Sequence, residues 1–272
     1  MDLQIDCKEV GFVHSKKQDI LSYISDLRYL EVAEQNRNIR ALLWDSSLGE
    51  PPSNSRLEFI PVVQSKLAFL FLQNSFKTNY AKSQISASSS IAPTAVISNF
   101  GVSIGENVVI EDFVVIKEGT SIGSQSIIRS GTVLGSQALS VAKDGEGLLR
   151  EMQHLGGVHI GADVTIGSNC VIDKAIFRWE DTVIGDQTKI GALTNISHGV
   201  QIGNNNNISA GVNICGYTVL GNDSWVGPNV TISHMLKIGS RVYLSMSSTV
   251  LQDINDEWKV VQSRIFRERK LF

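Results

Sequence analysis

The chain has few cysteines, little net charge and no long apolar run. It has 3 cysteines in 272 residues, Cys7, Cys170 and Cys215, which are too far apart for a metal-ligand spacing or a disulfide framework. We therefore expect a reducing, cytoplasmic compartment. A net charge of −3 at pH 7 offers no basic surface for nucleic acid. The longest apolar run, Leu67 to Leu72, is too short to span a membrane, and the acidic start MDLQIDCKEV lacks the apolar core of an export signal.

Glycine, by contrast, is abundant and regularly spaced. Against 5 prolines the chain has 23 glycines, many of which belong to a repeat of six residues. An aliphatic residue recurs at every sixth position from Ile104 to Leu134, and again from Ile160 to Val250. Arg178 is the one departure among these 22 positions, and 11 of them are followed directly by glycine. A period of six fits neither an α-helix nor an amphipathic strand, and it is typical of a parallel β-helix.

This period resembles that of the hexapeptide-repeat family, which implies a left-handed, triangular coil of three hexads, or eighteen residues. We predict a mainly β fold, with a left-handed parallel β-helix over residues 85–252 and a small α/β domain over residues 1–84 before it. Residues 136–158 fall out of phase and are expected to form a loop thrown out from the coils, and residues 253–272 a charged tail. Long loops in a regular scaffold are usually functional.

A coil of eighteen residues would place three chemically suggestive residues in one column. His198, Gly216 and His234 are eighteen positions apart, and each histidine follows its phased isoleucine by two positions, on the outer surface. A histidine near its reference pKa can take a proton at neutral pH, and a glycine amide can hold the oxyanion of a tetrahedral intermediate. The column suggests a general base beside an oxyanion site. Two surface histidines aligned by chance with a corner glycine remain the alternative.

Other residues suggest chemistry more weakly. His159, just before the phased Ile160, is a candidate contact to the donor or acceptor of a reaction. Cys215 could be an acyl-accepting nucleophile, although an inert small residue is favoured because no cation other than His198 is implied beside it. A solvated loop face is favoured over an acid–base or metal cluster for four residues of the loop: Asp144, Glu146, Glu151 and His154. We expect no metal site.

Longer motifs make the resemblance more specific. The segment GGVHIGADVTIGSNCVIDKA, the segment DTVIGDQTKIGALTNISHGVQIG that follows it, and IRSGTVLGS before the loop resemble the UDP-3-O-acylglucosamine N-acyltransferase family of lipid A synthesis. In the first domain, ILSYISDLRYLEVAEQNRNIRALLW and PVVQSKLAFLFLQ look like a shortened form of that family's nucleotide-binding domain. The resemblance therefore covers roughly residues 20–250.

The resemblance implies roles for individual residues. His198 matches the family's catalytic histidine, and Gly216 matches the glycine whose amide faces the oxyanion. Tyr23 and Tyr29 fall where the family places aromatic residues that grip the uracil, and a tyrosine offers a flat face for stacking. His234 lies one place before the family's second histidine, as a candidate substrate contact. A homotrimer, a thioester co-substrate (acyl-CoA or acyl carrier protein) and the absence of a permanently bound cofactor are also implied.

The departures from the family pattern lie around the donor and the acceptor. Gly191 stands where the family has an aspartate that helps to orient the histidine, Gly199 replaces an asparagine, and the carboxy-terminal extension that meets acyl carrier protein is reduced. We therefore favour acyl transfer from acyl-CoA to the amine of a UDP- or dTDP-linked amino sugar for surface polysaccharide, such as O-antigen. The alternatives are an acyl-carrier-protein-dependent UDP-3-O-acylglucosamine N-acyltransferase of lipid A synthesis, a sugar O-acetyltransferase, and a non-catalytic trimeric scaffold.

Overall fold

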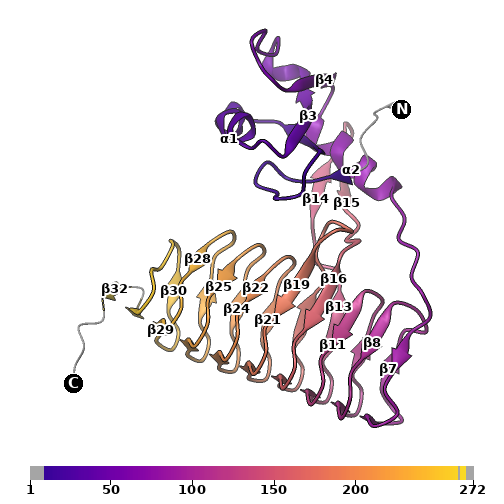
Figure 1. Ribbon diagram of the computed structural model, residues 1–272. Coiled ribbons are helices and arrows are strands. Elements are labelled where there is room, and N and C mark those ends of the chain that lie inside the picture. Colours follow the sequence, from indigo (N-terminus) through magenta and orange to yellow (C-terminus); the bar gives the residue numbers. More distant parts are fainter. Residues whose placement is uncertain (1–8, 263, 268–272) are drawn as a thin grey trace. The chain divides into compact units, whose positions relative to one another are not determined.

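The computed structural model describes residues 9–262 and 264–267 (Figure 1). Cys7 and the last residues of the predicted tail, 268–272, lie outside the described residues. Contacts divide the chain into two compact units. The first holds the chain up to Lys77 together with Leu139–Gln153, and the second holds Thr78–Ala138 together with the chain from His154 onward.

The first unit contains a four-stranded parallel sheet whose strands lie side by side in chain order. Strand β3 reads as a nearly continuous buried run from Ala41 to Trp44, as expected for a parallel strand covered on both faces. The small α/β region predicted from the sequence is therefore present. Its elements are β1 (Glu9–Val10), β2 (Ile20–Ile24), η1 (Leu27–Tyr29), α1 (Leu30–Gln35), β3 (Ile39–Asp45), η2 (Ser46–Leu48), β4 (Glu58–Val62) and α2 (Ser65–Ser75).

The predicted loop over residues 136–158 contains a β-hairpin made of β14 (Val141–Lys143) and β15 (Leu149–Glu151). Asp144 closes its turn, because its Oδ1 accepts hydrogen bonds from the backbone N–H groups of Glu146 (3.0 Å) and Leu148 (2.9 Å). The side chain of Asn74 on α2 joins the hairpin through backbone atoms of Glu151 and Gln153. Strands of three residues carry too little alternation to be seen in the sequence.

The second unit is a parallel β-helix with three sides, each of which is a sheet whose coil strands run parallel (Figure 1). The first side consists of β5 (Gln84–Ile85), β8 (Val102–Ile104), β11 (Thr120–Ile122), β16 (Gly157–Ile160), β19 (Asp181–Ile184), β22 (Gln201–Ile202), β25 (Val219–Leu220) and β28 (Lys237–Ile238). The second side consists of β6 (Ser90–Ile91), β9 (Val109–Ile110), β12 (Ile127–Ile128), β17 (Thr165–Ile166), β20 (Lys189–Ile190), β23 (Asn207–Ile208), β26 (Trp225–Val226), β29 (Tyr243–Leu244), β31 (Trp258–Val261) and the antiparallel β32 (Arg264–Arg267). The third side consists of β7 (Val96–Ile97), β10 (Val115–Ile116), β13 (Val133–Ser136), β18 (Val171–Asp173), β21 (Asn195–Ile196), β24 (Asn213–Ile214), β27 (Thr231–Ile232) and β30 (Thr249–Val250).

The strand register confirms the eighteen-residue coil. Ile196 pairs with Ile214, and Ile214 pairs with Ile232 on the next coil. Ile172, however, pairs with Ile196, 24 positions further on. Six residues therefore leave the coil between β18 and β19, and the interpretation of Arg178 as a phased position was wrong: it is an exposed residue of this insertion.

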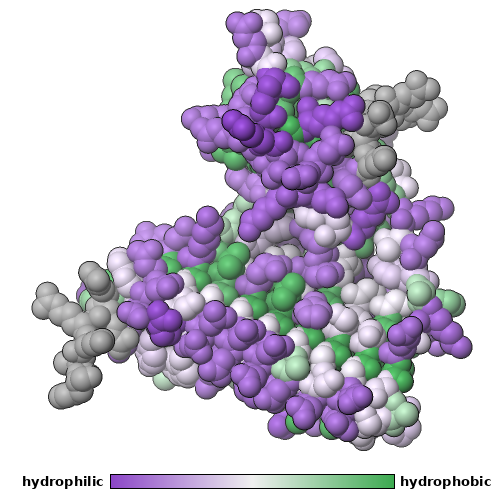
Figure 2. Space-filling view, viewed as in Figure 1, coloured by the Kyte–Doolittle hydropathy of each residue, from purple (hydrophilic) through white to green (hydrophobic). Residues whose placement is uncertain are grey.

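The inward residue of each coil strand forms the core. Ile196, Ile214 and Ile232 are all fully buried, whereas their outward neighbours on the same strands are polar and partly exposed. Each coil buries its aliphatic side chains against the coils on either side, so the stack has a nearly one-dimensional core. Figure 2 shows apolar residues (green) recurring along the visible face of the β-helix between polar residues (purple).

The first strand of the β-helix, β5, lies at residues 84–85, beside the predicted start at residue 85, whereas its ladder continues beyond the predicted end at residue 252. At its start, β5 already pairs with β8, before the first phased isoleucines. At its end, β31 pairs with β29, so the ladder continues beyond residue 252 into the stretch predicted as a tail. The described part of that stretch is therefore structured, because Ile254 and Val260 supply further buried residues at the core positions.

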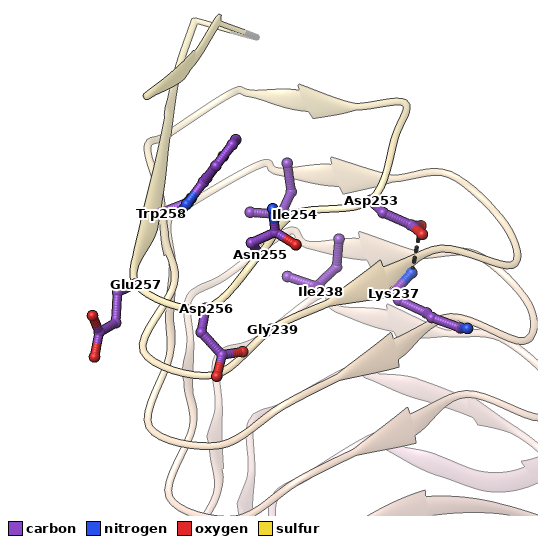
Figure 3. Close-up of a pocket in the computed structure, with 9 residues that line it drawn as sticks. All are labelled: Lys237, Ile238, Gly239, Asp253, Ile254, Asn255, Asp256, Glu257 and Trp258. Carbon is purple, nitrogen blue, oxygen red and sulfur yellow. Dashed lines mark hydrogen bonds between the residues drawn. The ribbon is translucent and has the colours of Figure 1, made fainter. Parts of the chain in front are cut away.

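A hollow of about 710 Å³ marks this last coil (Figure 3). Two of the carboxylates in it bond to backbone donors of the preceding coil: Asp253 accepts from the N–H of Lys237 (2.8 Å), and Asp256 accepts from the N–H of Ser240 (2.9 Å). Ile254 lies over Ile238 (Figure 3). These contacts provide acceptors for backbone N–H groups near the end of the stack, so we assign Asp253 and Asp256 to capping.

Candidate active site

The predicted column of His198, Gly216 and His234 is present. The three residues each follow a strand of the third side by two positions, at the corner that leads to the first side. Successive coils are tied together at this corner by backbone hydrogen bonds. The N–H of Tyr217 donates to the carbonyl of His198 (3.0 Å), and the N–H of Met235 donates to the carbonyl of Gly216 (2.9 Å).

The imidazole of His198 lies directly against Gly216. A Cβ on Gly216 would collide with Cε1 of His198 and lie 2.8 Å from its Nε2. Only a residue without a side chain therefore allows the ring to occupy this place. Within the described residues, the N–H of Gly216 has no hydrogen-bond acceptor, so it is available to a developing negative charge.

The two ring nitrogens of His198 have different surroundings. Nδ1 is enclosed and has no hydrogen-bond partner within the described part of the chain, whereas Nε2 is not enclosed. Burial lowers the pKa of His198 below its usual value of 6.5, because the charged form loses hydration. The ring is therefore neutral at pH 7, and Nε2 is the nitrogen that can exchange a proton with a substrate.

His154 is a second histidine in the site, and its assignment to a solvated loop face was wrong. It is buried, and its ring centroid lies 5.3 Å from that of His198, edge to face. Its Nδ1 is 3.3 Å from the backbone oxygen of Lys174. Burial, together with the neighbouring His198, lowers the pKa of His154 to about 4. Residues of an insertion have no phase, so no signal in the sequence placed His154 here.

Tyr217 and Glu180 complete the surroundings of His198. The Tyr217 ring lies 5.2 Å from the imidazole with an interplanar angle of 69°. Its hydroxyl donates to Oε1 of Glu180 at 2.6 Å. Burial and the neighbouring carboxylate raise the pKa of Tyr217 well above 10, and burial raises the pKa of Glu180. The position of Tyr217 beside His198 follows from the coil period, whereas Glu180 comes from the insertion and carried no signal.

His159 and His234 lie apart from the imidazole of His198. His159 is exposed on β16, where its Nδ1 lies 2.8 Å from the hydroxyl of Ser121. His234 is exposed one coil beyond Gly216, with Nδ1 3.5 Å from the hydroxyl of Ser233. Neither makes a ring contact or hydrogen bond with His198 within the described residues. Both are open to a ligand, and their predicted substrate contacts stay predictions.

Tyr23 and Tyr29 differ in how far they are open to a ligand. Tyr23, on β2, packs against Phe69 with ring centroids 4.9 Å apart, and burial raises its pKa. Tyr29, in η1, is 46% exposed and meets His14 edge to face. The exposed ring of Tyr29 is thus the better stacking surface, and the role of the pair in gripping a base stays a prediction.

The first unit also has a cavity that the sequence did not indicate. Its volume is about 390 Å³, and it lies where β2, β3 and β4 end, the edge at which parallel sheets commonly bind ligands. Ser25, Asp45 and Gln64 come from that edge, and Lys143 comes from the hairpin. Neither Tyr23 nor Tyr29 lines it.

The remaining chemical groups are less suited to catalysis. Cys215 is a free thiol beside Gly216, and burial raises its pKa, which keeps it protonated and weakens it as a nucleophile. Asp144 is engaged in the hairpin turn and in an ion pair with Arg150 (2.8 Å). No group of three or more histidine, cysteine, aspartate or glutamate side chains within residues 9–262 and 264–267 is arranged to hold a metal ion.

Comparison with known proteins identifies the repeats. Residues 101–136 and 181–216 match the family described as bacterial transferase hexapeptide (six repeats). UDP-3-O-acylglucosamine N-acyltransferase of Coxiella burnetii is 26% identical over 231 residues, which cover 72% of this chain and 65% of that protein. The enzyme of the same name from Chromohalobacter salexigens is 35% identical over 88 residues, 32% of this chain and 24% of that protein. This chain thus spans about 65% of the length of the first of these relatives.

A solved structure supports the fold. The UDP-N-acetylglucosamine acyltransferase of Francisella novicida superposes with a TM-score of 0.54 at 20% identity, over 66% of this chain and 65% of that one. None of the helices in the described residues has the length and apolar character needed to cross a membrane. The resemblance inferred from the sequence is confirmed in these terms: residues 101–136 and 181–216 match the hexapeptide repeats of bacterial transferases, and the relatives named above are acyltransferases of UDP-linked sugars.

Proposed function

We propose that this protein is an N-acyltransferase that moves an acyl group from a thioester to the amine of a nucleotide-linked amino sugar. The observation that carries the proposal is the contact between the His198 ring and Gly216, whose N–H has no acceptor within the described residues. A neutral base and a free amide donor within one contact distance are what acyl transfer to an amine requires. The relatives named as N-acyltransferases of a UDP-linked glucosamine support the same reaction.

The steps follow from the positions of these groups. The sugar amine attacks the thioester carbonyl carbon, and Nε2 of His198 takes the proton that the nitrogen loses. The carbonyl electron pair moves to oxygen, where the N–H of Gly216 holds the oxyanion. Collapse of the tetrahedral intermediate breaks the carbon–sulfur bond, and the imidazolium returns its proton to the departing thiolate. The products are an amide and a free thiol, and His198 is again neutral.

The two co-substrates are assigned by different features. We keep acyl-CoA as the proposed donor because Gly191 and Gly199 depart from the family pattern around the donor and the acceptor. For the acceptor, we propose that the first unit binds the UDP or dTDP group, with Tyr29 as the exposed stacking surface. A homotrimer is part of the proposal through the family resemblance.

One alternative has an observation in its favour. The named relatives are UDP-3-O-acylglucosamine N-acyltransferases, so the acceptor could be that lipid A precursor and the donor an acyl carrier protein. The chemistry at His198 would be unchanged, and only the length of the acyl chain and the carrier would differ.

Thioester consumption distinguishes these possibilities. The full chain is incubated with acyl-CoA or acyl carrier protein of graded acyl length, together with UDP- and dTDP-linked amino sugars, and the products are analysed by mass spectrometry. We expect an alkali-stable amide, formed fastest with a short acyl-CoA. An alkali-labile ester would assign O-acylation instead, and consumption only with long acyl carrier protein would assign the lipid A reaction. If no thioester is consumed with any of these acceptors, the proposal is contradicted and a non-catalytic scaffold is favoured.

A further inference from the structure

Two rings and two glycines interlock at the corner that holds His198. The pair His198-Gly199 lies one coil away from the pair Gly216-Tyr217, in register. The His198 ring occupies the space that a side chain on Gly216 would need. The Tyr217 ring likewise covers Gly199, where an added Cβ would lie 2.7 Å from Cε1 of Tyr217. Each large side chain thus fills the space left by a glycine in the neighbouring coil.

The insertion between β18 and β19 holds Tyr217 in this arrangement. The Tyr217 hydroxyl donates to Oε1 of Glu180 at 2.6 Å. Glu180 is itself tied to the insertion, because its N–H donates to the carbonyl of Phe177 (3.1 Å) and its Oε1 lies 3.3 Å from the N–H of Phe177. The Phe177 ring stacks on Trp179 with centroids 5.4 Å apart. The side chain of Tyr217 is therefore held by two contacts, with Gly199 against its ring and with Glu180 at its hydroxyl.

Among residues 9–262 and 264–267, no carboxylate bonds to the ring of His198. The resemblance places an orienting aspartate at residue 191, but Gly191 follows β20 at a different corner of the coil. A Cβ on Gly191 would collide with the backbone nitrogen of Ala210 and lie 2.7 Å from the carbonyl carbon of Ser209. Nδ1 of His198 has no partner within the described residues. The direction of the imidazole must therefore be fixed by packing.

We propose that Tyr217, held by Glu180, is the positioning residue of His198 and keeps Nε2 directed outward for proton transfer. The inference rests on the proposed function for its kinetic consequence, although the geometry of the ring can be measured without it. Proton transfer requires the base within hydrogen-bond reach of the substrate proton, so a ring that is free to turn spends less time in the productive direction.

Three variants separate the contributions of the ring, its hydroxyl and the carboxylate. Tyr217→Phe keeps the ring and removes the donor, Glu180→Ala removes the acceptor, and Glu180→Gln keeps an oxygen that can accept the phenol proton. We expect kcat to fall about tenfold in each of the first two variants, with both KM values within about twofold of the original. Glu180→Gln should restore kcat to within about threefold. The double variant Tyr217→Phe/Glu180→Ala should be no slower than either single one, because both changes break the same contact.

Tyr243→Phe is the matched control, because Tyr243 lies on the second side of the β-helix and stacks on Trp225. It should leave kcat unchanged. Thermal unfolding of every variant shows whether a lower kcat follows from a smaller folded fraction. If the loss in Tyr217→Phe disappears once the rate is divided by the folded fraction, the positioning role is overturned.

Nitrogen-15 imidazole spectra of the full chain give a readout that needs no substrate, with His198→Ala assigning the signal. We expect one tautomer of His198 in the native protein and in Glu180→Gln, and a mixture or exchange broadening in Tyr217→Phe and Glu180→Ala. Unchanged His198 signals in these two variants would overturn the positioning role even if no acceptor were turned over. A native protein without turnover would instead contradict the proposed function, so the two failures are distinguishable.

Discussion

Two stretches of the β-helix contribute different parts of the candidate site. From β20 to β30 the coils keep the eighteen-residue register without interruption, and this stretch supplies His198, Gly216 and Tyr217. Between β13 and β19 the chain leaves the coil twice, and this stretch supplies His154 and Glu180. The regular coils thus bring a base and a bare amide together, whereas the insertions supply His154, whose ring contacts that of His198, and Glu180, which bonds to Tyr217.

The pH dependence of stability tests what the irregular stretch contributes. The pKa of His154 is lowered from 6.5 to about 4 in the folded protein, so the unfolded chain takes up a proton first as the pH falls. The free energy of unfolding should therefore decrease from about pH 6.5 to about pH 4, by about 3 kcal/mol in total. Urea unfolding over this range measures the loss.

A matched pair of variants assigns this pH dependence. His154→Gln should flatten the decrease by the contribution of one proton, whereas His234→Gln, at an exposed position, should leave it in place. If the free energy of unfolding falls equally steeply with pH in the native protein and in His154→Gln, the assignment of His154 to a buried environment is contradicted. The burial of His198 acts in the same direction, so a smaller slope should remain after His154 is replaced.

Gly216→Ala tests what the regular stretch contributes. The added Cβ would collide with Cε1 of His198, so the ring must move away from the amide. A displacement of about 1 Å at a reacting group can cost about a hundredfold, and we expect kcat/KM to fall by at least about that factor. Gly145→Ala is the control, because a Cβ there meets no atom within 4 Å. Equal kcat/KM values for the native protein and Gly216→Ala would contradict the proposal that acyl transfer depends on the contact between His198 and Gly216.

Gly191→Asp sharpens the comparison by restoring the residue that the family resemblance expects. The backbone around Ala210 leaves no space for a side chain, so the coil must shift. We expect the variant to lose about 2 kcal/mol of unfolding free energy, by analogy with overpacked cores, and to gain no activity. An increase in kcat without loss of stability would show that His198 is oriented by a carboxylate after all.

The sequence predicted the regular part of the site because repetition turns spacing into position. Ile196, Ile214 and Ile232 keep one phase, so the neighbours two places beyond them, His198, Gly216 and His234, had to share a column. The six-residue period gave wrong or no positions where residues leave the coil. It counted Arg178 as a core position, and it gave no indication of where His154 or Glu180 would lie.

The last coil of the β-helix was likewise not predictable from the six-residue period. The final coil is held by Asp253 and Asp256, whose carboxylates bond to backbone N–H groups, and hexads of aliphatic residues do not reveal such capping contacts. What replaces the missing aspartate at residue 191 in orienting His198 could not be predicted from the sequence either. Position 191 corresponds to the aspartate of the family pattern, but its glycine packs against the backbone of the next coil, and this constraint is visible only in the folded structure.

The rate of acyl transfer by His198→Ala, compared with that of the native protein, tests the central claim most directly. Cys215→Ser serves as the control, because it alters the thiol beside Gly216 and leaves the imidazole in place. With an acyl thioester and an amino-sugar nucleotide that the native protein uses, kcat/KM should fall by about 10²–10⁴ in His198→Ala and stay within about threefold in Cys215→Ser. Turnover that survives in His198→Ala, or that is lost in Cys215→Ser, would contradict the assignment of His198 as the base.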